Sequence, residues 1–217
     1  MVCFEFSGNV EGMQTFSLCF IFLLLLQTHT ARAHQPQEGQ ILVSLGPTFY
    51  STEPIDEAPQ NDRKDRLGAM LLVEGDVDRN GGIEVSLGFQ DKLYYKYKGG
   101  FFLAEEIKRL AIGAGYRHWF NPWFSVASHF VSLYSIGDAI TVHTDYPLSF
   151  NKSTTAQDTT EYGFDISLMF ELWAKDKSHV VIDIKYFAST SAGGSESADT
   201  LTAFLGYKHL IQSGSGK

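Results

Sequence analysis

From residue 40 onward, apolar side chains recur at every second position, which is the pattern of β-strands that have one apolar and one polar face. The clearest segment is 162–172, where Tyr, Phe, Ile and Leu alternate with Gly, Asp, Ser, Met and Glu. Eight segments show this alternation, and none of them requires a helix. They run over 41–49, 67–77, 83–97, 110–120, 124–134, 162–172, 180–186 and 201–207.

The connections between these predicted strands are unequal in length. Three are compact turns, at 78–82, 121–122 and 175–178. Four are longer and polar, at about 51–66, 98–105, 135–160 and 188–199. Because an up-and-down meander places alternate connections at opposite ends, we expect short turns at one end of the sheet and long loops at the other.

Residues 16–26 form the only continuous apolar run, which is 11 residues long. At about 1.5 Å per residue, a helix of this length falls short of the roughly 30 Å hydrocarbon layer, but it fits the apolar core of a secretory signal peptide. Ala31, Arg32 and Ala33 then give the small-x-small pattern of a cleavage site. We expect residues 1–33 to be an export signal, with Met13 as an alternative start. The other interpretation is a buried apolar helix.

Composition narrows the classes of partner. The chain has 217 residues, 44% of them hydrophobic, which suffices for one domain with a sizeable core. Lys and Arg number 17 against 25 Asp and Glu, and a net charge of -8 argues against nucleic acid as a partner. Both cysteines, Cys3 and Cys19, lie in the expected export signal, so the mature chain is expected to have no disulfide and no thiol nucleophile.

The polar face of the predicted strands indicates which way the apolar face turns. It carries many small residues, whereas a strand face in water more often holds Lys, Glu and Thr, because Gly weakens a strand. The lumen of an eight-stranded barrel is narrow and needs small residues beside long ones, so we expect the polar face inside. The opposite orientation, a soluble carrier of the lipocalin type, is the alternative. The small residues are Ser44, Gly46, Ser86, Gly88, Gly113, Gly115, Gly163, Ser167 and Gly206.

These features, with the segments AIGAGYRHWF at 111–120 and FLGYKH at 204–209, resemble the small outer-membrane β-barrels of Gram-negative bacteria, the OmpA/OmpX/OmpW-like group. The resemblance covers residues 40–211. It implies an all-β fold, an eight-stranded antiparallel up-and-down transmembrane β-barrel over 34–212 with a polar tail at 213–217. It also implies a location in the bacterial outer membrane, with outer-membrane lipid and the barrel-assembly machinery as partners.

Aromatic side chains are expected to gather at two heights on the outside of such a barrel. Phe120, Phe124 and Phe170 fit the end with short turns. Tyr95, Tyr97, Tyr134, Tyr162 and Tyr186 fit the end with long loops. Strict alternation turns all three tryptophans, Trp119, Trp123 and Trp173, inward.

Charged residues at inward positions form the first candidate site. The third and fourth strands are neighbours, so Glu84 and Arg117 are placed to pair directly. One interpretation is a salt-bridge network that fills the lumen, because an unpaired buried charge costs several kcal/mol. The other is a polar gate or a narrow ion path. The expected network consists of Glu74, Asp76, Glu84, Arg117, Asp165, Glu171, Asp183, Lys185 and Lys208.

An enzymatic site would need a nucleophile, a base and an acid. Ser125, His129 and Asp165 all face inward, which would suit a lipid hydrolase or acyltransferase. However, Ser125 and His129 are four residues apart on one strand, roughly 13 Å, which is too far for direct proton transfer. We therefore predict no catalytic residue. The histidines show no metal-ligand spacing and no phosphate-binding loop occurs, so no metal and no cofactor are expected.

The 26-residue connection at 135–160 is long for an uninvolved loop and is the best place for contact with an extracellular ligand, through Asp138, Tyr146, Phe150 and Asn151. The sequence favours a non-enzymatic outer-membrane barrel with a structural or surface-interaction role and a plugged or narrow lumen. A small pore or transport path for ions or hydrophobic molecules is the second hypothesis. A lipid-modifying enzyme is the third.

Overall fold

The structure, a computed structural model, describes residues 35–52, 66–147, 154, 156–190 and 199–213. The expected export signal lies outside these residues, as do most of the connections expected at 51–66 and 188–199. Within the described residues, no helix is long and apolar enough to cross a membrane. The elements are β1 (Ile41–Thr52), β2 (Arg66–Asp76), β3 (Gly81–Lys98), β4 (Phe101–Asn121), β5 (Phe124–Ser135), β6 (Ile140–Thr144), the 3-10 helix η2 (Ala156–Asp158), β7 (Glu161–Lys175), β8 (Ser178–Ser189) and β9 (Thr200–Gln212).

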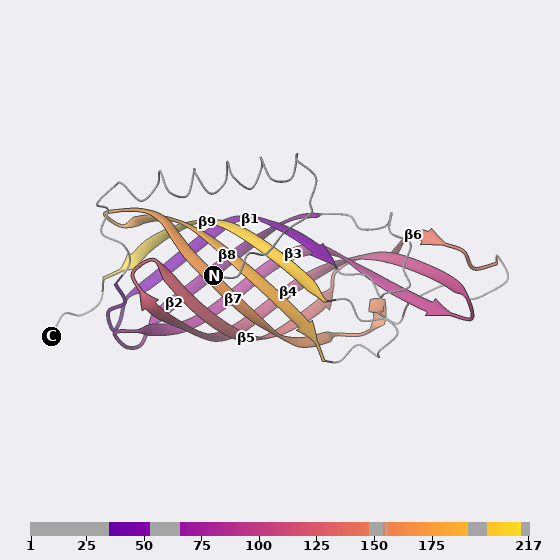
Figure 1. Ribbon diagram of the computed structural model, residues 1–217, viewed down its shortest axis with the longest axis horizontal. Coiled ribbons are helices and arrows are strands. Elements are labelled where there is room, and N and C mark those ends of the chain that lie inside the picture. Colours follow the sequence, from indigo (N-terminus) through magenta and orange to yellow (C-terminus); the bar gives the residue numbers. More distant parts are fainter. Residues whose placement is uncertain (1–34, 53–65, 148–153, 155, 191–198, 214–217) are drawn as a thin grey trace, which may run out of the picture.

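In the part of the chain that the structure describes, all strands except β6 close into a barrel of eight antiparallel strands. The order around the barrel is β1, β2, β3, β4, β5, β7, β8 and β9, and β9 returns to pair with β1. Each barrel strand therefore neighbours the barrel strands before and after it in the chain, which confirms the predicted up-and-down topology. Figure 1 shows the strands inclined to the long axis of the barrel, with the compact turns gathered at one end.

The apolar face of the sheet points outward and the polar face points into the barrel. On β7, Phe164 and Ile166 are 54% and 58% exposed, whereas Asp165 between them is 6% exposed. The same alternation holds on β1, where Leu45 is exposed and Ser44 is fully buried. The predicted orientation is confirmed, and the carrier-like alternative, with its apolar residues around a central cavity, is wrong.

The prediction of a long connection at 98–105 is wrong, because β3 and β4 continue through these residues. Their pairing is unbroken from Gly81 opposite His118 to Lys98 opposite Phe101. The turn consists of Gly99 and Gly100, whose φ angles of 63° and 81° are in the left-handed region that glycine adopts without strain. The pairing of β3 with β2 ends at Phe89, so the hairpin projects beyond the rim of the barrel (Figure 1).

A strand that the alternation did not reveal lies within the connection at 135–160. Strand β6 pairs with β4 at Leu103–Glu106, beyond the barrel wall, and η2 follows it in the chain. Since β6 has only five residues, it is too short to show a clear period of two. Its effect is to widen the projecting hairpin into a three-stranded sheet.

Two residues expected on the outer apolar face, Leu93 and Tyr95, are buried instead, at 1% and 0% exposure. They pack with Phe102 and Ala104 of the hairpin, and Val142 of β6 covers this cluster. Tyr95 therefore does not belong to an outer aromatic belt. Tyr97, Tyr134, Tyr162 and Tyr186 are exposed as expected.

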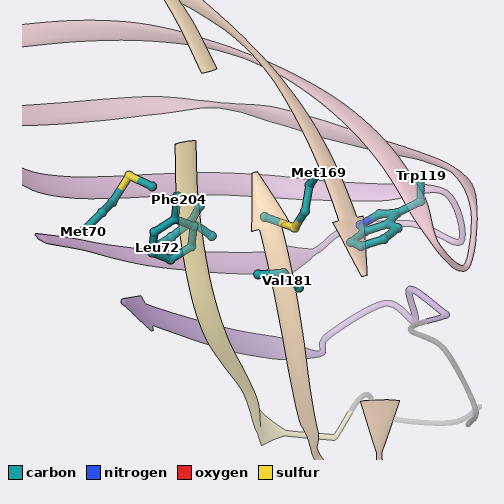
Figure 2. Close-up of a cluster of buried hydrophobic side chains, with 6 residues drawn as sticks. All are labelled: Met70, Leu72, Trp119, Met169, Val181 and Phe204. Atoms are coloured by element: carbon teal, nitrogen blue, oxygen red, sulfur yellow. The ribbon is translucent and has the colours of Figure 1, made fainter. Parts of the chain in front are cut away.

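The lumen contains an apolar layer as well as polar groups. Trp119 points inward, as strict alternation predicts. Trp123 lies in the turn between β4 and β5 and is 41% exposed, and Trp173 follows a bulge in β7 and is half-buried. The prediction that the Trp123 side chain points inward is therefore wrong, because Trp123 lies outside the regular pairing of the strands. Figure 2 shows the buried cluster, which consists of Met70, Leu72, Trp119, Met169, Val181 and Phe204.

Candidate functional site

One row of paired residues crosses four strands of the barrel and defines the centre of the candidate site. Glu84 of β3 lies opposite Gly115 of β4, Gly115 lies opposite His129 of β5, and His129 lies opposite Asp165 of β7. Gly115 has no side chain, so Glu84 and His129 meet across it, with 2.8 Å between Glu84 Oε1 and His129 Nε2. A Cβ atom on Gly115 would lie 2.6 Å from the His129 ring and 2.0 Å from the carbonyl oxygen of Ser128.

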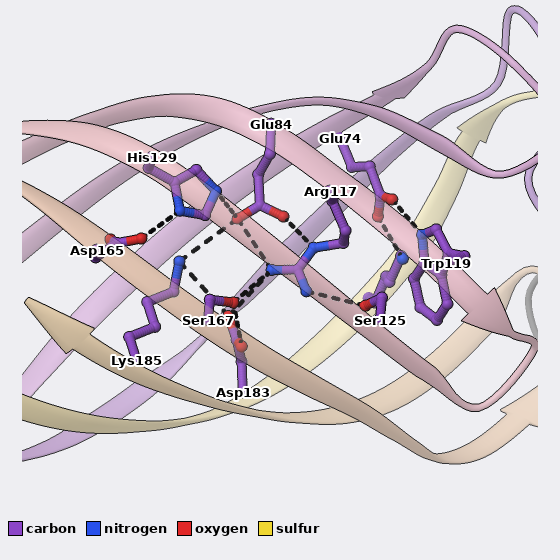
Figure 3. Close-up of polar contacts among 11 residues, drawn as sticks. Glu74, Glu84, Arg117, Trp119, Ser125, His129, Asp165, Ser167, Asp183 and Lys185 are labelled. Carbon is purple, nitrogen blue, oxygen red and sulfur yellow. Dashed lines mark hydrogen bonds and ion pairs between the residues drawn. The ribbon is translucent and has the colours of Figure 1, made fainter.

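Arg117 occupies the middle of the lumen next to this row (Figure 3). Its guanidinium donates two hydrogen bonds to Glu84, at 2.5 and 3.2 Å, and one to Asp183 at 3.3 Å. It also donates to the hydroxyls of Ser125 at 3.0 Å and Ser167 at 2.9 Å. This planar group with five donors therefore joins β3, β5, β7 and β8 across the barrel.

Lys185 completes this group from β8. Its ammonium lies 3.4 Å from Glu84 and 3.5 Å from Asp183, and Ser167 donates a 2.6 Å hydrogen bond to Asp183. His129 is hydrogen-bonded to Asp165 through Nδ1. We call these side chains the mid-lumen network: Glu84, Arg117, Ser125, His129, Asp165, Ser167, Asp183 and Lys185.

A separate ion pair lies on the side of Arg117 that faces away from His129. Lys208 Nζ is 2.6 Å from Glu74 Oε2, and Trp119 Nε1 donates to Glu74 Oε1 at 2.6 Å. Glu74 and Glu84 are directly opposite each other on β2 and β3. Like charges opposite each other repel, so each of the two carboxylates needs its own cation. Glu74 therefore pairs with Lys208, whereas Glu84 pairs with Arg117.

The remaining two predicted network residues lie outside these groups. Glu171 pairs with His179 at 2.9 Å. Asp76 accepts a hydrogen bond from the backbone N–H of Gln37 at 3.3 Å. All nine predicted residues are buried, and the structure contains the Glu84 and Arg117 pair that the sequence analysis expected.

The charged groups of the mid-lumen network are buried, and three of them are fully removed from solvent. Arg117, Glu84 and Asp183 are 0% exposed. Taking such ions out of water costs several kcal/mol each, so they are stable only with opposite charges and hydrogen bonds around them. The structure supplies both in this part of the lumen.

A second buried group at the mouth of the lumen was missed by the sequence analysis. Lys92 Nζ lies 2.8 Å from Glu161, which also accepts a 2.5 Å hydrogen bond from Tyr94. Arg109 donates to Ser135 Oγ at 2.7 Å and stacks on Tyr94, with 4.8 Å from the guanidinium carbon to the ring. We call Lys92, Tyr94, Arg109 and Glu161 the mouth cluster. The alternation already placed these residues inward. Lys92 is an even number of positions from Glu84 on the same strand, and Arg109 is an even number of positions from Arg117, so each pair shares a face.

The mouth cluster fixes part of the connection at 135–160. Arg109 donates to the carbonyl oxygens of Ala156 at 2.5 Å and Thr159 at 3.1 Å. Glu105 accepts a 2.7 Å hydrogen bond from the backbone N–H of Thr154. Ala156 also packs against Tyr94 in a small apolar cluster. The segment around η2 is therefore attached to the top of the lumen.

A cavity of about 60 Å³ lies between the two groups. Asp165 and Lys185 of the mid-lumen network line it, and so does Phe187, whose ring lies 4.7 Å from the Lys92 ammonium. Three threonines, Thr48, Thr200 and Thr202, also line it. The volume suits a few water molecules and is smaller than a cavity that holds an aromatic ring.

The residues considered as a catalytic set do not form one, because Ser125 and His129 each contact other partners. The hydroxyl of Ser125 accepts from Arg117, whereas His129 lies between Glu84 and Asp165. Of the residues proposed for surface contact, Asp138 is exposed and Tyr146 packs its ring 5.4 Å from that of Phe101. Phe150 and Asn151 lie outside the described residues. In the described part of the chain, no group of three or more His, Cys, Asp and Glu side chains is placed to hold a metal ion.

Comparison with known proteins gives matches in structure but none in sequence. The chain matches no protein-family model and no curated protein. Ail, the attachment invasion locus protein of Yersinia pestis, superposes with a TM-score of 0.48 at 13% identity, over 79% of this chain and 99% of that one.

Two further outer-membrane proteins superpose in the same way. OprG of Pseudomonas aeruginosa has a TM-score of 0.47 at 11% identity, over 84% of this chain and 100% of that one. AlkL has a TM-score of 0.45 at 9% identity, over 88% and 98%. At these identities the likeness concerns the fold only. By its own strand order, closure and orientation of faces, the chain has the fold of a small eight-stranded outer-membrane β-barrel.

Proposed function

We propose that this protein is a non-enzymatic barrel of the bacterial outer membrane, with a closed lumen and a structural or surface-interaction role. The outer surface supports the membrane location. Phe124 and Tyr134 both face outward on β5 and are ten residues apart. Ten residues at about 3.3 Å, on a strand tilted by about 40°, span roughly 25 Å in height, which is the thickness of the apolar band on transmembrane barrels.

Aromatic rings mark both borders of this band. At the end with short turns, the rings of Phe120 and Phe124 are 5.8 Å apart and those of Phe124 and Phe170 are 5.1 Å apart. At the other end Tyr134 and Tyr162 are exposed. Outer-membrane lipid is therefore the partner proposed for the outer face, and insertion by the barrel-assembly machinery is part of the same proposal.

The observation that carries the closed lumen is the burial of the charges inside it. Arg117, Glu84, Asp183, Glu74 and Lys208 are all 0% exposed. A water-filled channel would leave the charged groups on its wall accessible to solvent. Their complete burial supports a plug. In this proposal, the projecting sheet and the connection at 135–160, including Asp138 and Tyr146, make any contact with the exterior.

A small ion path is the second candidate function, and the cavity of about 60 Å³ above the mid-lumen network favours it. In this alternative, the plug would be a gate that rearranges its ion pairs. The lipid-modifying enzyme has less support, because Ser125 and His129 are both engaged with other partners.

Two measurements test the proposal. The folded barrel should stay with the outer-membrane fraction and migrate faster on gels before heating than after it. In planar bilayers at about pH 6 it should show no steady conductance. Recovery of the protein from the periplasmic fraction without a heat-dependent shift would contradict the membrane barrel, whereas steady conductance at this pH would favour the ion path.

A further inference from the structure

Both ring nitrogens of His129 face a carboxylate. Nε2 lies 2.8 Å from Glu84 Oε1, and Nδ1 is hydrogen-bonded to Asp165 Oδ1 (Figure 3). An ionised carboxylate offers only lone pairs, so a proton on each ring nitrogen makes both contacts attractive. A neutral imidazole carries one N–H group and the protonated ring carries two. The two short contacts therefore favour the protonated form of His129.

Charge balance in the mid-lumen network leads to the same result. Besides His129, it contains three carboxylates, which are those of Glu84 on β3, Asp165 on β7 and Asp183 on β8. It also contains two permanent cations, Arg117 on β4 and Lys185 on β8. With a neutral His129 the network has a net charge of -1, and with a protonated His129 it is neutral. The adjacent pair of Glu74 and Lys208 is balanced by itself.

We propose that the proton on His129 is a latch that keeps the lumen closed, and that its loss opens a cation path through the mid-lumen network. Without this proton, one ring nitrogen would present a lone pair to a carboxylate, and that contact would become repulsive. Glu84 would keep Arg117 and Lys185 as partners. Asp165, by contrast, hydrogen-bonds no other side chain in the described part of the chain. It would keep only the longer-range attraction of Lys185, whereas Glu84 keeps direct contacts, so Asp165 is the carboxylate that is released.

Because of its position, a released Asp165 carboxylate would enter the cavity. It already lines the cavity above the network, so its carboxylate would turn into a space that water can fill. The network would then carry one uncompensated negative charge, which attracts cations and repels anions. The inference rests on the proposed membrane barrel and adds to it a control of the closed state by protons.

A second buried histidine provides a matched control. His179 lies near the end with short turns, and its Nδ1 is 2.9 Å from Glu171. A neutral imidazole can make this contact with its single N–H group. Replacement of His179 should therefore not imitate replacement of His129.

Conductance of the full chain in planar bilayers, measured in KCl from about pH 6 to about pH 9, tests the latch. We expect the wild type to be closed at the acidic end and to conduct at least roughly tenfold more at the alkaline end, with cation selectivity. His129→Gln should conduct at all pH values, because an amide, like a neutral imidazole, carries no charge and leaves the network with a net charge of -1. Asp165→Asn should stay closed, and His179→Gln should behave like the wild type.

Nitrogen NMR of the histidine-labelled protein supplies a readout that does not depend on any variant. Both ring nitrogens of His129 should be protonated while the lumen is closed, and the proton should be lost at the pH at which conductance rises. A neutral His129 in the closed barrel, or a pH response that survives in His129→Gln, would overturn the latch. A heat-dependent gel shift confirms that each variant is folded. If the wild type shows no such shift, the membrane barrel itself fails, whereas a folded barrel with a flat pH profile removes only the latch.

Discussion

Arg117 and Arg109 lie eight residues apart on the same strand and are both 0% exposed, yet they are stabilised in different ways. Arg117 is surrounded by carboxylates and hydroxyls that belong to barrel strands. Arg109 donates to one hydroxyl and to two backbone carbonyls around η2. The first arginine therefore ties the barrel wall together across the lumen, whereas the second attaches a connecting segment to the mouth.

The difference indicates what each region contributes. In the mid-lumen network every charge depends on the others, so the loss of one leaves a buried ion without compensation. At the mouth the acceptors of Arg109 are neutral, and they can turn to water when the arginine is removed. The middle of the lumen should therefore determine global stability, and the mouth should determine the order of one segment.

The largest effect is expected for Arg117→Met, which leaves Glu84 and Asp183 buried with less positive charge. We expect the free energy of unfolding to fall by about 3–5 kcal/mol, as measured by urea unfolding of the barrel in lipid vesicles. Adding Glu84→Gln to this variant should recover part of the loss, because the two residues are coupled. A loss below about 1 kcal/mol would remove the contrast with the mouth.

A smaller effect is expected for Gly115→Ala in the row that joins Glu84 to His129. The new methyl group would meet the Ser128 carbonyl oxygen at 2.0 Å and the His129 ring at 2.6 Å. The strands have to shift, which should cost about 1–3 kcal/mol in the same unfolding experiment. Gly75→Ala is the matched control, since nothing lies within 4 Å of its Cβ position. Equal losses in the two variants would show that the close packing at Gly115 has no special weight.

Replacement of Arg109 by Met should mainly affect the mouth. The carbonyls of Ala156 and Thr159 would lose their donor, so the amides around η2 should exchange hydrogen faster, while the free energy of global unfolding changes by about 1–2 kcal/mol. Hydrogen-exchange mass spectrometry checks this. Lys108→Met, at the exposed neighbouring position, should leave the exchange unchanged. A loss as large as that of Arg117→Met would mean that the mouth also holds the barrel together.

The smallest effect is expected outside both regions, in the turn between β2 and β3. The backbone N–H of Asn80 donates to Asp78 at 2.7 Å and holds the pKa of this carboxyl group below its ordinary value. A lowered pKa in the folded state stabilises the fold above the ordinary pKa, and this contribution is lost as the pH falls through the lowered value. Because Asp78 is exposed, Asp78→Asn should change the acid dependence of unfolding only slightly. A large change would show that this turn, too, controls the barrel.

Much of the fold could be predicted from the alternation along each strand. A period of two follows from strand geometry, so it identified the barrel strands and the inward side of all nine charged residues. It failed where the environment of a strand changes along its length. Tyr95 continues the outer face of β3, but it lies beyond the barrel rim, where Val142 of β6 packs against its cluster.

The candidate site was predicted less completely. Arg117 and Glu84 could be paired because their strands are consecutive, but His129 was considered only as a catalytic base. Its true neighbours depend on the register of three strand pairs, which brings Glu84, Gly115, His129 and Asp165 into one row. A shift of two residues in any of these pairs would keep each side chain on its own face but give it another partner, and the alternation alone does not distinguish such registers.

The order of polar and apolar residues by itself determined which residues share a face of each strand, because that depends only on their place in the alternation, and the small residues of the polar face indicated that this face turns inward. Only the tertiary structure decided which charge meets which, how far the hairpin of β3 and β4 extends, and where β6 attaches. These depend on contacts between distant segments, and those contacts exist only once the sheet has closed.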